Sequence, residues 1–249
     1  MAPDGSPDPS ATFEVTHEAE ATGTLVIGLS QFGLAGLTAV DYLTDRLEGD
    51  PVGHITAEDL PTITPFEEGR PRHHTRIFDT VREDITLLEN ELFVPVWAAD
   101  SFAKAVLEWI AQNEINEIAI LSGVPVPHGP EEHRVFYIAT DDYRELRFDG
   151  TDVPPMGVGF LDGVNASLIA RGMQSPLRTG IFVTPVHAQA PDVEAALRLL
   201  ETFSQVYDLA IDTEPLRQFA SEVENYYREL ADRLETVEER HVPDDRMYM

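Results

Sequence analysis

Thr24-Leu25-Val26-Ile27-Gly28 opens the clearest strand-to-helix unit of this 249-residue chain. Its continuous apolar centre is typical of a strand that is buried on both faces, as strands are in parallel sheets. A turn through residues 30–33 follows, and then a helix over residues 34–47. The unit therefore predicts a parallel α/β sheet.

Further strands and helices alternate as far as residue 212. We expect an edge strand at 12–16, a hairpin from 77–81 and 85–88, strands at 117–121, 135–139, 157–160 and 179–184, and helices at 101–113 and 164–172. Such alternation is typical of a three-layer α/β/α sandwich, so we assign residues 12–212 to one α/β/α domain.

Helical periodicity continues beyond the last strand. A first amphipathic helix spans about 193–207 and is expected to pack on the sheet. A second covers residues 213–242, with apolar residues spaced three and four apart as in coiled coils. The second helix fits either an ordinary surface helix or a self-association element that carries a flexible tail over residues 243–249.

Gly28, Gly33 and Gly36 surround the first turn. A phosphate-binding P-loop needs Gly-Lys-Ser or Gly-Lys-Thr at its end, and the dinucleotide fingerprint needs its first two glycines two residues apart. Neither condition holds here, because Leu34 and Ala35 follow Gly33. We interpret the three glycines as structural residues of a tight turn and close helix packing.

The composition is strongly acidic. Asp and Glu number 45 against 17 Lys and Arg, which gives a net charge of -28, and Lys104 is the only lysine. Acid excess spread through an otherwise globular sequence indicates a halophilic, molar-salt cytoplasm. Such a surface disfavours nucleic-acid binding. Screening over about 3 Å at 1 M salt means that partner recognition must use apolar contacts at close range.

Targeting and reactive-cysteine features are missing from the sequence. Residues 1–11 are rich in Pro, Ser and Asp without a basic or apolar block, so we expect a disordered N-terminus and no signal peptide. No apolar run reaches the ~18 residues of a membrane span. The absence of cysteine excludes disulfides and thiolate sites. We expect a soluble cytoplasmic protein without membrane contact.

The sequence given ends in Arg246-Met247-Tyr248-Met249. Met247 and the Tyr248 ring offer apolar and aromatic surface, the phenol offers a hydrogen-bond donor, and a free carboxylate on Met249 would offer a charge to a lysine in a receiving pocket. Met247, Tyr248 and Met249 are therefore the candidate partner-binding residues.

The unit from Gly28 to Leu43 resembles the opening of the archaeal proteasome assembly chaperone family. The resemblance continues at residues 60–61, 91–95, 118–125, 157–162 and 191–196 and covers about nine tenths of the chain. It implies a three-layer fold similar to nucleoside phosphorylases, self-association, and a hydrophobic-Tyr-X tail that docks into pockets between α-subunits of the core proteasome. It also implies no catalytic residues and no cofactor. Ser30-Gln31 departs from the Pro-Gly of many members, which leaves the role of that loop open.

Two other functional classes remain open on the sequence. One is an enzyme resembling nucleoside phosphorylases, with a pocket near Gly28, Ser122 and Phe160 and with Arg134 or Arg171 converging on it. The other is an adaptor without proteasome contact. A triad of Ser122, His128 and an aspartate lacks the Gly-x-Ser-x-Gly elbow, and the histidines lack metal-binding spacing.

Overall fold

The computed structural model describes residues 11–19, 21–80, 83–126, 133–187 and 191–221. The chain divides into two compact units, residues 1–211 and residues 212–249. The first unit carries the sheet and its helices. In the second unit residues 214–221 are helical, and the remainder of the predicted 213–242 helix lies outside the described residues.

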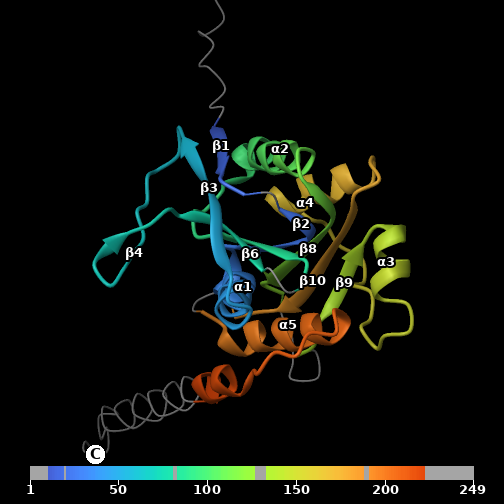
Figure 1. Ribbon diagram of the computed structural model, residues 1–249. Coiled ribbons are helices and arrows are strands. Elements are labelled where there is room, and N and C mark those ends of the chain that lie inside the picture. The colour runs from blue at the N-terminus through green and yellow to red at the C-terminus, as the bar shows by residue number, and fades with distance from the viewer. Residues whose placement is uncertain (1–10, 20, 81–82, 127–132, 188–190, 222–249) are drawn as a thin grey trace, which may run out of the picture. The chain divides into compact units, whose positions relative to one another are not determined.

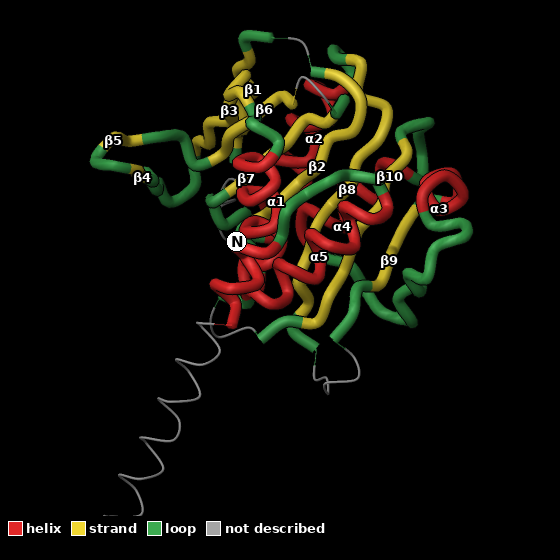
Figure 2. Tube along the Cα trace, turned by 60° about the horizontal axis from the view of Figure 1, so that its bottom comes forward, coloured by secondary structure: helices red, strands yellow, loops and turns green. Residues whose placement is uncertain are grey.

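An eight-stranded mixed sheet organises the first unit. The strand order is β1-β3-β6-β7-β2-β8-β10-β9, in which the four strands β7, β2, β8 and β10 are parallel and the flanking pairs are antiparallel. Figure 2 shows β2, β8, β10 and β9 side by side. The strands are β1 (Thr12–His17), β2 (Thr22–Leu29), β3 (Asp50–Glu58), β6 (Thr75–Thr80), β7 (Ile85–Asn90), β8 (Glu114–Val124), β9 (Phe136–Ala139) and β10 (Arg178–Pro185). A separate two-stranded flap is formed by β4 (Phe66–Glu67) and β5 (Arg70–Pro71).

Helices cover both faces of the sheet. The helices α1 (Ala35–Arg46) and α5 (Val193–Val206) pack together on one face, and α2 (Ala99–Ile110) and α4 (Gly163–Gly172) pack together on the other (Figure 1). The helix α3 (Asp141–Arg147) lies beside β10. Two short 3-10 turns, η1 (Phe32–Leu34) and η2 (Val96–Ala98), precede α1 and α2. The predicted three-layer α/β/α architecture is confirmed.

The core follows from strand periodicity. Alternate residues of the parallel strands, such as Leu25, Ile120 and Ile181, belong to the apolar cluster with Phe102 of α2 and Leu168 of α4. Their sequence neighbours, including Val26, Leu121 and Phe182, are also buried and point to the opposite, α1–α5 face. Because both faces are covered, these strands are apolar at successive positions.

Strand β1 extends the α2 side of the core. The rings of Phe13 and Phe102 meet edge to face with centroids 5.2 Å apart. The edge strand predicted at 12–16 is confirmed as β1. The hairpin predicted from 77–81 and 85–88 is confirmed by the antiparallel pairing of β6 with β7. Among the described residues, no helix combines the length and apolar character of a membrane span.

One predicted strand was wrong, and several elements were not predicted, among them β3, α3 and the β4–β5 flap. Residues 157–160 form a loop instead of a strand, and the segment just before them contributes one isolated bridge, from Pro155 to Tyr137 of β9. Glycines at 157 and 159 weaken strand pairing, so the alternating pattern alone did not produce a strand. The whole of β3 was not predicted, because its polar residues, Pro51 and Gly53 interrupt the apolar pattern.

Candidate functional site

The first strand-to-helix turn brings α1 very close to the sheet. A Cβ on Gly36 would lie 1.9 Å from the carbonyl oxygen of Leu121, and one on Gly28 would lie 2.7 Å from the carbonyl oxygen of Gly36. Gly33 has a φ of +67°, in the left-handed region that favours glycine. Close packing and backbone conformation account for the three glycines of the turn.

A buried polar cluster lies at the carboxyl ends of the parallel strands. Ser122 Oγ, near the end of β8, donates to Oε1 of Gln31 at 2.9 Å. The Asn165 amide, in the first turn of α4, donates to Gln31 Oε1 at 3.1 Å and to Ser122 Oγ at 3.0 Å. These bonds fix the start of α4 against the β2–α1 turn. Within the described residues no histidine or carboxylate bonds to Ser122, and His128 lies outside them.

The two arginines of the enzyme hypothesis do not converge on one site, although the Arg134 carbonyl accepts a hydrogen bond from Thr184 near the carboxyl end of β10. The Arg134 guanidinium stacks over the ring of Phe136, 5.0 Å from its centroid. Arg171 lies in the last turn of α4, at the opposite end of that helix from Asn165. Among the described residues, the histidines, aspartates and glutamates form no group of three that could hold a metal ion.

Large apolar side chains are exposed around the same edge. They come from η1, from the β7–α2 connection and from the loop before α4: Phe32 (58% exposed), Phe93 (70%), Val96 (67%), Trp97 (49%), Val158 (108%) and Phe160 (105%). We call these six residues the carboxyl-edge apolar surface. Residues 28–40, 92–99 and 153–161, from which they come, contain no charged residue. In so acidic a chain, exposed apolar side chains in segments without charge make this edge a candidate for contact with another macromolecule.

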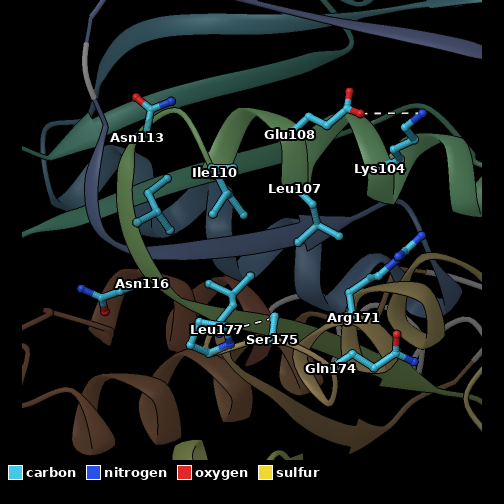
Figure 3. A pocket seen from close by; sticks show the side chains of 13 residues that line it. Lys104, Leu107, Glu108, Ile110, Asn113, Asn116, Arg171, Gln174, Ser175 and Leu177 are labelled. Atoms are coloured by element: carbon cyan, nitrogen blue, oxygen red, sulfur yellow. Dashed lines mark hydrogen bonds and ion pairs between the residues drawn. The ribbon is translucent and has the colours of Figure 1, made fainter.

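A groove of about 760 Å³ lies between the carboxyl-terminal halves of α2 and α4. Leu107 and Ile110 project into it from α2, and Leu177 faces them from the segment before β10 (Figure 3). Two cations lie on its rim. Lys104 pairs with Glu108 at 3.7 Å, whereas Arg171 has no partner among the described residues. We call this cavity the α2–α4 groove. The groove could not be predicted from the sequence, because three separate segments form it.

A second buried network surrounds Glu117 at the start of β8, whose side chain is 1% exposed. It accepts hydrogen bonds from Arg147 at 2.9 Å and from Arg178 at 3.2 Å. The Tyr207 hydroxyl bonds to it at 2.6 Å and to the Tyr143 hydroxyl at 2.8 Å. Burial raises the pKa of both tyrosines above the ordinary value, so both phenols remain protonated donors.

A third network surrounds Glu89 on β7, whose side chain is also 1% exposed. Thr44 Oγ1 donates to Glu89 Oε1 at 2.5 Å, and Arg76 donates to Oε2 at 2.5 Å. Arg76 also bonds to Glu91 at 3.1 Å and lies 3.9 Å from Asp41. Burial raises the pKa of Glu89 to about 6, although the Thr44 bond and the Arg76 charge oppose the shift.

The candidate partner-binding residues Met247, Tyr248 and Met249 lie outside the described residues. Their role therefore stays a prediction. The described residues add the carboxyl-edge apolar surface and the α2–α4 groove as further candidates for protein contact.

One known protein family matches most of this sequence. The model of the PAC2 family matches residues 25–231, which is most of the chain. No protein of curated function matches the sequence.

Several solved structures share the architecture. Pyrococcus furiosus PbaA, described as an archaeal homolog of proteasome-assembly chaperone, superposes with a TM-score of 0.80 and 19% identity, over 92% of this chain and 95% of that chain. Pyrococcus furiosus PbaB, described as an archaeal proteasome activator, gives 0.74 and 18%, over 90% and 99%. A Thermoplasma acidophilum protein of unknown function gives 0.73 and 21%, over 89% and 90%. At these identities the similarity establishes the common fold.

Proposed function

Because this chain belongs to the PAC2 family, we propose that it is a proteasome assembly chaperone or an activator-like factor. In this proposal it acts as a homo-oligomer that binds the α-subunits of a core proteasome in the cytoplasm, and it binds rather than catalyses. The observation that carries the proposal is the family match over residues 25–231. The descriptions of PbaA as a homolog of an assembly chaperone and of PbaB as a proteasome activator support it.

The contact with the core particle is assigned to Met247, Tyr248 and Met249. A penultimate aromatic ring enters a groove between α-subunits, the Met247 side chain covers apolar surface beside it, and a carboxylate on Met249 pairs with a lysine. The contact is short and mainly apolar, so it tolerates a medium in which charges are screened beyond about 3 Å. It requires Met249 to carry a free carboxylate.

Self-association strengthens such a contact. One tripeptide offers little buried area, but several copies held together engage several pockets of one α-ring. Once one tail is bound, the others bind at a high effective concentration, and the avidity exceeds that of one tail by roughly a hundredfold or more.

The test is co-sedimentation of the full chain, ending at Met249, with core proteasomes in molar-salt buffer. We expect three changes to reduce binding at least tenfold: deletion of residues 247–249, Tyr248→Ala, and extension beyond Met249 by Gly-Ser. The extension is informative because it leaves every side chain in place and moves the terminal carboxylate from Met249 to a residue two positions further on. Met247→Leu, which keeps an apolar residue, serves as the matched control and should bind as the unmodified chain does.

Equal binding by the unmodified chain, the Tyr248→Ala variant and the extended chain would contradict the assignment of the tail. An unmodified chain that never sediments with core particles would favour the adaptor hypothesis. Circular dichroism and solution mass of each variant establish that fold and assembly are retained.

A further inference from the structure

The loop before α4 projects an apolar knob from the first unit. Val158 is 108% exposed and Phe160 is 105% exposed. Nothing lies within 4 Å of the positions that a Cβ would take on Gly157 or Gly159. The segment is nevertheless anchored, because the backbone N–H of Met156 donates to the carbonyl of Tyr137 at 2.8 Å. We call residues 157–161 the knob.

The α2–α4 groove is an apolar depression that could receive the knob. Its floor is lined by Leu107, Ile110 and Leu177, and its volume of about 760 Å³ is within the range of sites that enclose a drug-sized ligand. Such a site is large enough for a phenylalanine side chain and its neighbours. Aromatic side chains are the groups most often buried at the centre of protein contacts.

The charges of the two surfaces are also complementary. The knob carries no charge itself, but Asp152 and Asp162 flank it in the sequence. The rim of the groove carries Lys104, which is paired with Glu108, and Arg171, which has no partner among the described residues. Cations are scarce in a chain with a net charge of -28, so the Arg171 guanidinium on the rim favours an occupant flanked by acids.

The knob cannot occupy the groove of its own domain. It precedes the first residue of α4, whereas the groove lies at the last turn of the same helix. A ten-residue helix separates the two by a rise of about 15 Å, and its start is fixed by the Asn165 hydrogen bonds.

We propose that the knob of one copy inserts into the α2–α4 groove of a second copy, with Phe160 as the central side chain. The contact joins two different surfaces, so copies associate head to tail, and one end copy offers a free knob and the other a free groove until a ring closes. This contact specifies how copies associate and does not depend on the docking of the tail to a proteasome.

The test uses two variants of the full chain in molar salt. Phe160→Asp charges the knob, and Ala111→Glu places a charged side chain at an exposed position of the groove lining. Light scattering after size exclusion should give an oligomer for the unmodified chain and a single chain of 27.7 kDa for each variant alone. Both substitutions are at exposed residues, so folding should be retained, which circular dichroism checks.

Mixing the two variants separates a head-to-tail contact from a symmetric one. The Phe160→Asp copy keeps an intact groove and the Ala111→Glu copy keeps an intact knob, so the mixture should form a one-to-one pair and grow no further. The matched control is Phe66→Asp on the β4–β5 flap, an exposed phenylalanine (74%) outside both surfaces, which should leave the mass of the oligomer unchanged.

Several results would overturn the proposal. These are an unmodified chain that remains monomeric, either variant keeping the oligomer mass, or a mixture that stays monomeric although both variants are folded. Core-particle binding is measured separately, so loss of the pair in the mixture and loss of tail docking give different readings.

Discussion

Two glutamates are buried on the same face of the sheet, and their surroundings differ in almost every respect. Glu117 of β8 aligns with Thr24 of β2, and Glu89 of β7 aligns with Gly28, four residues further along the same strand. Both side chains are therefore on the α1–α5 side, one toward the amino ends of the strands and one toward the carboxyl ends. Each is 1% exposed.

Glu117 and Glu89 differ in how many hydrogen-bond donors they have and in whether those donors are shared with another carboxylate. Glu117 receives two guanidinium groups, and its further donors come from Tyr207 and from Thr24 at 3.3 Å. Glu89 receives one threonine hydroxyl and one guanidinium, and that guanidinium is shared with Glu91. A buried carboxylate offsets its desolvation penalty only where hydrogen-bond donors satisfy the lone pairs of both oxygens. Glu117 therefore holds the surrounding arginines and tyrosine in place, whereas Glu89 is a carboxyl group whose pKa is raised to about 6.

The largest expected effect is at Glu117. Replacing it by leucine removes the acceptor that holds Arg147, Arg178 and Tyr207 together. Breaking a buried ion pair typically costs 3–5 kcal/mol. Because the two arginine side chains are 27% and 33% exposed and can turn to water, we expect a loss of about 3 kcal/mol, at the low end of that range. Urea unfolding at fixed salt measures it.

The matched control for Glu117→Leu is Glu145→Leu on α3, a glutamate that is 66% exposed. That change should alter the free energy of unfolding by no more than about 0.5 kcal/mol. If the Glu117 variant were as stable as the control, the network would be dispensable and the contrast between the two glutamates would disappear.

At neutral pH, replacing Glu89 should affect the free energy of unfolding in the opposite direction from replacing Glu117. Its folded-state pKa of about 6 lies above the ordinary value of 4.5. The fold therefore favours the protonated form, so the contribution to stability is complete below pH 4.5 and is lost as the pH rises through about 6. A shift of this size corresponds to roughly 2 kcal/mol. Glu89→Gln should lose this part of the pH dependence.

The measurement is the difference in unfolding free energy between Glu89→Gln and the unmodified chain from pH 4.5 to pH 7.5. We expect the difference to move in favour of the variant by about 2 kcal/mol over that range. Parallel pH profiles for the two proteins would mean that Glu89 is ionised at no cost, as a saturated carboxylate would be.

The parts of the fold that could be predicted are those that a short stretch of contiguous sequence determines. The β2–α1 unit was visible because a strand buried on both faces is continuously apolar, and the β6–β7 hairpin because apolar runs flank a short polar turn. Strand β3 was missed because it pairs antiparallel on both sides and carries polar residues at many positions. The pattern at 157–160 imitated a strand, but the loop exposes Val158 and Phe160.

The candidate sites divide in the same way. The Met247-Tyr248-Met249 tail is a short contiguous pattern, so sequence reasoning could propose it, and it lies outside the described residues. The Glu117 network joins residues 30 to 93 positions apart, and nothing distinguishes Glu117 from the other acids in a chain with 45. The α2–α4 groove likewise depends on three segments that meet only in the folded chain.

The smallest expected effect concerns Thr44, whose hydroxyl donates to Glu89 and also to the carbonyl of Val40 at 3.0 Å. The bond to Glu89 stabilises the carboxylate, so Thr44→Val should raise the pKa of Glu89 further and cost about 1 kcal/mol at pH 7. At pH 4.5 the Glu89 carboxyl group is mostly protonated, so the loss of unfolding free energy should be smaller.

The half-buried Thr38 of the same helix supplies the control, since Thr38→Val should show no such pH dependence. Urea unfolding of both variants at the two pH values decides the matter. An equal cost for Thr44→Val at pH 4.5 and pH 7 would mean that the hydroxyl does not respond to the charge of Glu89, and the distinction between a satisfied and a shared carboxylate would then need another cause.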